Sequence, residues 1–148
     1  MKDLPGLSFL DLAFHFYVKI NSINFQGDGK LQNLPHLFSA ATIEQSAARV
    51  ASMRAVIERT PILGVAGALR GMAIRPDRSS ELVGISVPTL VMVGEDDLIT
   101  PPDEARSLAA RIPDGRLHVI PHTGHLAPYE NPSLANALIL DFLRGLNA

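Results

Sequence analysis

One apolar run organises this chain: Val87-Pro88-Thr89-Leu90-Val91-Met92-Val93-Gly94. The run shows no alternation of polar and apolar residues, and a glycine closes it. An uninterrupted run of this length is typical of a strand that a parallel sheet buries on both faces. We therefore expect residues 87–94 to form an interior strand of an α/β domain.

The residues that follow predict a helix, a second strand and a last helix. Residues 100–104 combine a capping threonine, two prolines and two acids, which together mark the start of a helix. Residues 116–120 predict the next strand, and Asn131-Pro132 begins the last helix. This order implies parallel pairing of the strands. The predicted fold class is α/β, with a partial parallel sheet of two or three strands covered by helices.

Such a small parallel sheet leaves apolar strand edges unpaired. We therefore expect a homo-oligomer, or a partner chain that completes the sheet. A symmetric dimer that uses those edges would bury them most simply.

Two further helices are predicted upstream of the sheet. A capping box formed by Thr42 and Gln45 begins the first, which ends near Arg59. Thr60 is expected to cap the second, which ends before Arg75-Pro76. In this second helix Gly67 and Gly71 lie four residues apart. We interpret the pair as small residues that let another helix pack closely, rather than as a ligand or membrane contact.

Residues 1–41 differ from the rest of the chain. Apolar and polar residues repeat at helical spacing over residues 9–20, which predicts one mostly buried helix. Residues 21–35 are rich in glycine, asparagine and other turn formers and predict a loop. No catalytic or ligand-binding pattern is visible in this loop.

Composition narrows the functional classes. A chain of 148 residues is the size of one domain, and a net charge of −2 leaves no basic surface for nucleic acid. The absence of cysteine excludes disulfides, thiolate metal sites and a cysteine nucleophile. No apolar stretch approaches the roughly 20 residues of a membrane span, and no signal peptide is visible. We expect a cytoplasmic protein without a nucleic-acid or membrane partner.

Polar residues follow the two predicted strands at their carboxyl ends. Asp97 lies after the first strand and His125 after the second. Ligands of open α/β sheets bind at this edge, so the carboxylate and the imidazole are expected to lie close together. An acid placed there holds the histidine tautomer while the other ring nitrogen works as a general base.

These loops resemble the carboxyl-terminal half of the α/β-hydrolase superfamily. The resemblance rests on V-P-T-L-V-x-x-G-E-D-D-x-x-x-P over residues 87–101, on G-H-x-x-x-x-E-x-P over residues 124–132, and on the last helix. Residues 68–77 are similar to small esterases, lactonases and cofactor-free haloperoxidase-like members. The resemblance implies that Asp97 is the catalytic acid, with Asp96 as the second choice, and that His125 is the catalytic histidine. It implies no cofactor.

The resemblance also suggests how the chain is divided. Residues 42–80 look like lid helices, residues 81–148 like the carboxyl-terminal hydrolase subdomain, and residues 1–41 stay unassigned. We expect the resemblance to cover residues 42–146 only, with no match in residues 1–41.

The nucleophile of the family has no recognisable counterpart here. The family places its serine in a G-x-S-x-G turn ahead of the acid, and the sequence contains no such motif. Ser8, between Gly6 and Leu10, is the nearest approach, but Leu10 replaces the second glycine. We therefore expect an ester or lactone hydrolase whose serine comes from a longer parent chain or a separate chain. The alternative is a non-catalytic domain that pairs through its open sheet edge.

Two other interpretations concern residues near the predicted site. His118, His122 and His125 invite a zinc site, but His118 lies inside a predicted strand while the other two lie beyond its end, which argues against convergence. Glu130 is expected to tie down the histidine loop and the start of the last helix rather than to transfer a proton. Asp96 and Asp97 would also suit turn or capping roles.

Overall fold

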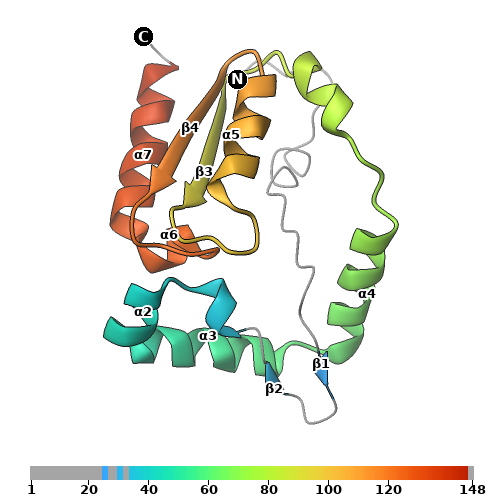
Figure 1. Cartoon of the computed structure of the whole chain (residues 1–148), viewed down its shortest axis with the longest axis vertical. Coiled ribbons are helices and arrows are strands. Elements are labelled where there is room, and N and C mark those ends of the chain that lie inside the picture. Colours follow the sequence, from blue (N-terminus) through green and yellow to red (C-terminus); the bar gives the residue numbers. More distant parts are fainter. Residues whose placement is uncertain (1–24, 27–29, 32–33, 147–148) are drawn as a thin grey trace.

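The computed structural model describes residues 25–26, 30–31 and 34–146 (Figure 1). Its elements follow in chain order: β1 (Phe25–Gln26), β2 (Lys30–Leu31), the 3-10 helix η1 (Leu34–Leu37), α2 (Ala40–Gln45), α3 (Ala47–Arg59), α4 (Ile62–Ala73), the 3-10 helix η2 (Ser79–Gly84), β3 (Thr89–Gly94), α5 (Pro102–Arg111), β4 (Gly115–Ile120), α6 (Ala127–Glu130) and α7 (Pro132–Gly145).

Strands β3 and β4 form the sheet that carries the site. They pair in parallel, from Thr89 opposite Gly115 to Gly94 opposite Ile120. Helix α5 connects them, as a parallel pair requires. The predicted fold class, an α/β unit of two parallel strands covered by helices, is confirmed. Strand β3 begins two residues inside the predicted 87–94 run.

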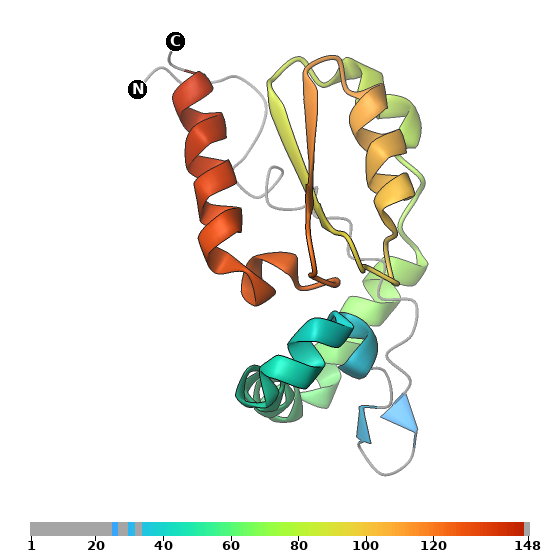
Figure 2. The same ribbon diagram turned by 60° about the vertical axis from the view of Figure 1, so that its left-hand side comes forward.

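The sheet lies between two helices. Helices α5 and α7 cover its opposite faces, and α6 leads from the end of β4 into α7 (Figures 1 and 2). Ile120, at the end of β4, is fully buried against Ala127, Ala135 and neighbouring apolar side chains. A second apolar cluster joins η1 to α3 through Leu34 and Phe38. Because Leu126 packs on this second cluster, the loop after β4 is held between the two.

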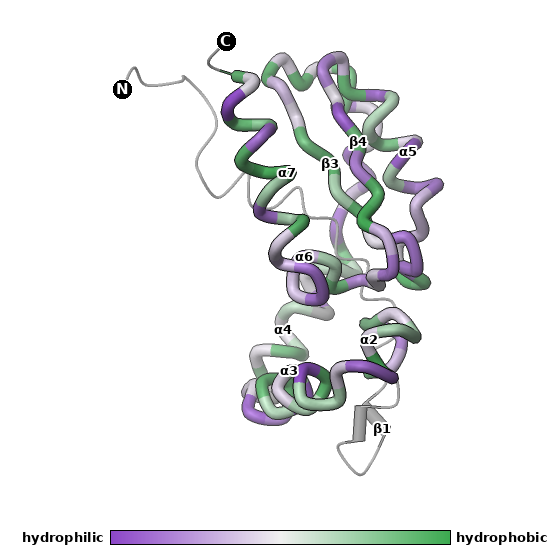
Figure 3. The backbone as a smooth tube through the Cα atoms, turned by 90° about the vertical axis from the view of Figure 1, so that its left-hand side faces the viewer, coloured by the Kyte–Doolittle hydropathy of each residue, from purple (hydrophilic) through white to green (hydrophobic). Residues whose placement is uncertain are grey.

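Strand β3 is buried at one end only. Val93 and Gly94 are buried, while residues 89–92 are partly exposed although the strand is mostly hydrophobic (Figure 3). In β4 exposed residues alternate with less exposed ones, and Arg116 and His118 face solvent. Burial on both faces was predicted for the whole 87–94 run. Within the described residues of this run, only Val93 and Gly94 are buried. Among the described residues β3 pairs with β4 alone, so its other edge has no neighbouring strand.

Helix α2 begins earlier than predicted. Ser39 is its N-cap, and its Oγ accepts a hydrogen bond of 3.1 Å from the amide N–H of Thr42. Thr42 therefore lies inside the helix, and the predicted capping box of Thr42 and Gln45 is wrong. A second break, at Ser46, separates α2 from α3. Ser39 suits its position because a short polar side chain satisfies a free backbone N–H at the start of a helix, whereas Ser46 makes no such side-chain hydrogen bond.

The predicted cap of α4 is wrong, whereas the predicted start of α7 is confirmed. Thr60 ends α3, and its Oγ1 donates to the carbonyl of Val56 at 3.0 Å, so it does not cap α4. Pro61 occupies that N-cap position instead. Asn131-Pro132 is confirmed as the start of α7, and the side chain of Asn131 caps this helix by accepting from Leu134 N–H at 3.1 Å.

The glycine pair of α4 does not receive another helix. A Cβ placed on Gly67 or Gly71 would meet no atom within 4 Å. The predicted close helix packing is therefore wrong for the described part of the chain.

The predicted loop at residues 21–35 contains regular structure. Strands β1 and β2 pair antiparallel, and η1 follows them. The helix predicted over residues 9–20 lies outside the described residues, as does Ser8. Among the residues that the structure does describe, no helix has the length and apolar character to cross a membrane.

Candidate active site

The loop after β3 holds Asp97 in a fixed orientation. Its side chain is 4% exposed, and Oδ1 accepts the amide N–H groups of Ile99 at 2.8 Å and Thr100 at 2.9 Å. Asp96, the second choice for the acid, is exposed, and its amide N–H donates to the carbonyl of Thr123. The structure thus turns the carboxylate of Asp97, and not that of Asp96, toward the interior of the site.

The loop after β4 is pressed against the end of β3. A Cβ on Gly94 would overlap the carbonyl oxygens of Thr123 and Gly124. A Cβ on Gly124 would lie 2.6 Å from the carbonyl carbon of Phe38. Only glycine allows both approaches, because real Cβ atoms do not come this close to backbone. These glycines therefore let the acid loop, the histidine loop and residues 38–39 meet.

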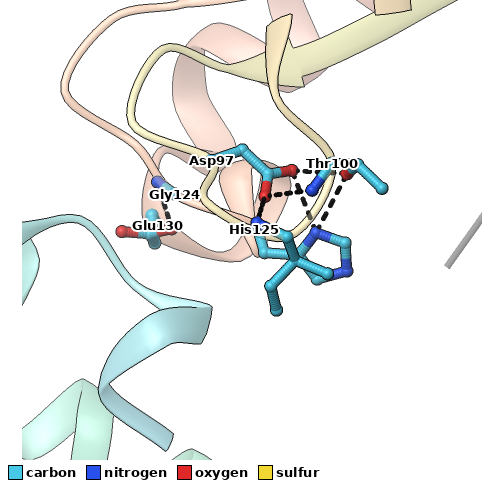
Figure 4. Close-up of polar contacts among 6 residues, drawn as sticks. Asp97, Thr100, Gly124, His125 and Glu130 are labelled. Atoms are coloured by element: carbon cyan, nitrogen blue, oxygen red, sulfur yellow. Dashed lines mark hydrogen bonds and ion pairs between the residues drawn. The ribbon is translucent and has the colours of Figure 1, made fainter. Parts of the chain in front are cut away.

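His125 and Asp97 form a buried hydrogen-bonded pair. Nδ1 of His125 lies 2.9 Å from Oδ2 of Asp97, and the imidazole is 9% exposed (Figure 4). An ionised carboxylate only accepts hydrogen bonds, so Nδ1 carries a proton, and in the neutral imidazole Nε2 then keeps a free lone pair. Figure 4 shows Nε2 on the side of the ring that faces away from Asp97. The pair therefore has the arrangement of an oriented general base.

The surroundings keep Asp97 ionised. Burial by itself raises the pKa of Asp97, but the hydrogen bonds from His125 and Thr100 outweigh it, and the net pKa lies below the usual value. These donors favour the charged carboxylate because each one bonds to an oxygen that carries negative charge. Asp97 is thus a charged acceptor for the imidazole at neutral pH.

The lowered pKa of Asp97 predicts a pH dependence of stability. An acid whose folded pKa lies below its unfolded pKa stabilises the fold fully above the unfolded pKa, about 3.9 for aspartate. That contribution is lost as the pH falls through the folded pKa. The free energy of unfolding should therefore decrease more steeply below about pH 4 in the wild type than in Asp97→Asn. Urea denaturation between pH 2 and pH 7 measures both slopes.

The exposed Asp141 on α7 provides a matched control, because Asp141→Asn should keep the wild-type slope. If Asp97→Asn also keeps the wild-type slope, Asp97 is not a stabilising ionised group.

Glu130 links the histidine loop to the segment before α2. The carboxylate is buried, Oε1 accepts the amide N–H of Gly124 at 2.7 Å, and Oε2 accepts the amide N–H of Ser39 at 2.8 Å. The hydroxyl of Ser39 donates to the same Oε2 at 3.0 Å. Glu130 thus ties down the histidine loop as predicted (Figure 4). The other carboxylate oxygen of Glu130 accepts hydrogen bonds from Ser39, and not from the start of the last helix as predicted.

Arg49 and Tyr129 extend this link to helix α3. A guanidinium N–H of Arg49 donates to the carbonyl of Glu130, and the same guanidinium lies 5.9 Å from the ring centroid of Tyr129. The hydroxyl of Tyr129 donates to the carbonyl of Arg49 at 3.2 Å. In addition, the amide N–H of Leu126 donates to the carbonyl of Leu37. Residues 37–39, in the segment without a predicted role, therefore support the histidine loop.

Glu130→Gln is expected to destabilise the protein by about 2–4 kcal/mol. The glutamine amide has one accepting oxygen, and its NH2 group would face the N–H of Ser39 or Gly124 and leave that donor without an acceptor. Urea denaturation measures the loss. Glu44→Gln, at an exposed position of α2, should change stability by less than about 0.5 kcal/mol. Equal stability of both variants would contradict the role assigned to the Glu130 carboxylate.

The three histidines do not form a metal site. His118 is exposed on β4, His122 lies beside Glu95 with its side chain 82% exposed, and His125 binds Asp97. Over the described ranges, no group of three histidine, cysteine or acidic side chains could hold a metal ion. The geometry agrees with the argument that His118 and the loop histidines would not converge.

Comparison with known proteins extends the resemblance. A family model described as alpha/beta hydrolase fold matches residues 13–132. The match begins well inside residues 1–41, so the expectation that nothing there resembles the family is wrong. The contacts of residues 37–39 with the histidine loop give a structural reason for part of this extension.

Several individual proteins are similar to parts of the chain. A 2-hydroxy-6-oxononadienedioate/2-hydroxy-6-oxononatrienedioate hydrolase of Pseudomonas putida is 42% identical over 69 residues, which are 47% of this chain and 24% of the relative. A thermophilic esterase from Thermogutta terrifontis superposes with a TM-score of 0.76 at 38% identity, over 78% of this chain and 42% of the esterase. Est816, described as an N-acyl homoserine lactone degrading enzyme, gives a TM-score of 0.62 at 30% identity, over 74% and 44%.

The chain thus spans about a quarter of this curated relative and under half of either solved structure. The family model, in contrast, matches most of the chain, and it includes both the acid and the histidine loop. The predicted superfamily is confirmed, and this chain belongs to the α/β-hydrolase fold family.

Proposed function

We propose that Asp97 and His125 are the acid and general base of a serine hydrolase that cleaves carboxylic esters or lactones. The observation that carries the proposal is the 2.9 Å hydrogen bond between Nδ1 of His125 and Oδ2 of Asp97 in a nearly buried setting. An imidazole oriented in this way can remove a proton from a hydroxyl through Nε2. The similarity to an esterase and to a lactone-degrading enzyme supports the substrate class.

The chemistry follows from this arrangement. Nε2 takes the proton of a serine hydroxyl while the serine oxygen attacks the carbonyl carbon of the ester or lactone. The imidazolium then donates that proton to the departing alkoxide. Water hydrolyses the acyl-enzyme with the same histidine as base. Asp97 stabilises the imidazolium in both halves of the reaction. The sequence contains no G-x-S-x-G motif that would supply the serine.

The serine is therefore proposed to come from a longer parent protein or from a separate chain. To test this, the 148-residue chain is mixed with the serine-bearing half of a homologous esterase, and hydrolysis of p-nitrophenyl acetate is followed. Activity in the mixture and in neither part alone is the expected result. Labelling of the isolated 148-residue chain by a fluorophosphonate probe would show instead that it contains its own nucleophile.

A second candidate function is a non-catalytic domain that pairs with itself or with a partner chain. Two observations favour it: among the described residues β3 pairs only with β4, and helix α7 exposes large apolar side chains at Ile139, Leu140 and Leu143. Contact with a second copy of the chain would remove these apolar side chains and the free edge of β3 from water. Sedimentation of the chain alone measures the mass of the particle in solution, and a monomer at high concentration would contradict this candidate function.

We also propose a cytoplasmic location, with which the lack of cysteine agrees.

A further inference from the structure

Thr100 contacts both members of the acid–histidine pair. Its hydroxyl donates to Oδ2 of Asp97 at 2.7 Å, and the same Oγ1 lies 3.3 Å from Nδ1 of His125 (Figure 4). The sequence predicted a helix cap at this position, but Pro101 is the N-cap of α5. The hydroxyl of Thr100 is thus directed into the site and leaves the helix end uncapped by a side chain.

The three polar atoms leave one consistent arrangement of protons. Oδ2 of the ionised Asp97 only accepts, and it receives the Thr100 hydroxyl at 2.7 Å and Nδ1 of His125 at 2.9 Å. Because the O–H group of Thr100 points to Oδ2 of Asp97, a lone pair of the hydroxyl oxygen faces Nδ1 of His125. The Nδ1–H of His125 then lies between two acceptors. A histidine protonated on Nε2 would instead direct the Nδ1 lone pair at the lone pairs of Oδ2.

The effect of the hydroxyl is separable from the placement of the acid. Oδ1 of Asp97 is held by two backbone N–H groups, from Ile99 and Thr100, which a change of side chain does not remove. Removing the Thr100 hydroxyl should therefore leave the carboxylate in position and change only what surrounds Nδ1. Valine has the branched shape of threonine without the hydroxyl, so it makes this change with little loss of packing.

We propose that Thr100 is a positioning residue: its hydroxyl, bound to Asp97, is the second acceptor for Nδ1–H and holds His125 in the tautomer with an unprotonated Nε2. This inference rests on the proposed function, in which Nε2 is the base. Thr100 acts through His125 and needs no contact with substrate.

Nitrogen and proton NMR of the 148-residue chain tests the inference without any nucleophile. The two ring-nitrogen shifts report the tautomer, and the Nδ1–H signal reports exchange with water. The wild type should show the Nδ1–H tautomer. In Thr100→Val, exchange of this proton should be about fivefold faster and the minor Nε2–H tautomer about fivefold more populated, as expected for the loss of one weak hydrogen bond. Thr100→Ser, which restores the hydroxyl, should behave as the wild type.

Identical tautomer populations and exchange rates in Thr100→Val and the wild type would overturn the inference. If the valine variant does not fold, Thr100→Ala compared with Thr100→Ser makes the same comparison. Asp97→Asn in the same experiment separates the two proposals. If the tautomer populations and the exchange rate change in Asp97→Asn but not in Thr100→Val, only the role proposed for Thr100 is wrong. If they change in neither variant, the acid–histidine pair does not form in solution, and the proposed function loses its support.

Discussion

Replacing His125 by alanine is expected to reduce ester turnover of the enzyme assembled from this chain and a serine-bearing half by about a millionfold. Without the imidazole nothing takes the proton of the serine hydroxyl, and a neutral hydroxyl is a weak nucleophile. Binding of the ester should change little, since His125 acts on the proton and not on the substrate carbonyl. Steady-state kinetics with p-nitrophenyl acetate separates the loss in kcat from any change in KM.

The matched control for this experiment is His118→Ala. His118 is exposed on β4, in the same chain but away from the acid loop, so its removal should leave kcat within about twofold. Retention of most of the activity in His125→Ala would show that another group acts as the base, and the proposed function would fail. Thermal unfolding of both variants establishes that each one is folded.

Asp97→Asn is expected to lower kcat of the same assembled enzyme by about ten-thousandfold. The asparagine oxygen can keep the N–H groups of Ile99 and Thr100, which now bind Oδ1. Its NH2 group then faces the ring and donates to Nδ1, which moves the ring proton to Nε2. A histidine protonated on Nε2 cannot accept the serine proton, so the loss should appear in kcat.

Asp96→Asn provides the control, since Asp96 is exposed and only its backbone contacts the histidine loop. It should retain nearly full activity. A large loss in Asp96→Asn together with a small one in Asp97→Asn would reverse the assignment of the acid. The two variants remove the same charge from adjacent positions, so a difference between them cannot come from net charge.

Much of the fold could be predicted because its signals are local. The apolar run at residues 87–94 indicated a strand, the two prolines and acids at 101–104 indicated the start of α5, and Asn131-Pro132 indicated the start of α7. Strand order then placed the two loops at one edge of the sheet, which was sufficient to bring Asp97 and His125 together. Each of these inferences depends on neighbours in the chain or on the regular geometry of a parallel pair.

Other features depend on which distant segments meet, and no local pattern contains that information. Ser39, 91 residues from Glu130, became both a helix cap and a donor to that carboxylate, so Thr42 lost the capping role that its spacing suggested. Thr100 does not cap α5, and its Oγ1 lies 3.3 Å from Nδ1 of His125, 25 residues further along the chain. In both cases a hydroxyl side chain makes a contact with a residue that lies close to it only in the folded chain.

The sequence by itself determined the α/β class and the family, because these follow from hydrophobic periodicity, strand order and local motifs. Only the tertiary structure showed that Asp97 is the carboxylate paired with His125, and that Glu130 joins Ser39 to the histidine loop. The physical reason is that hydrogen bonds to a buried carboxylate depend on distances of about 3 Å between loops, and such distances exist only once the chain has packed.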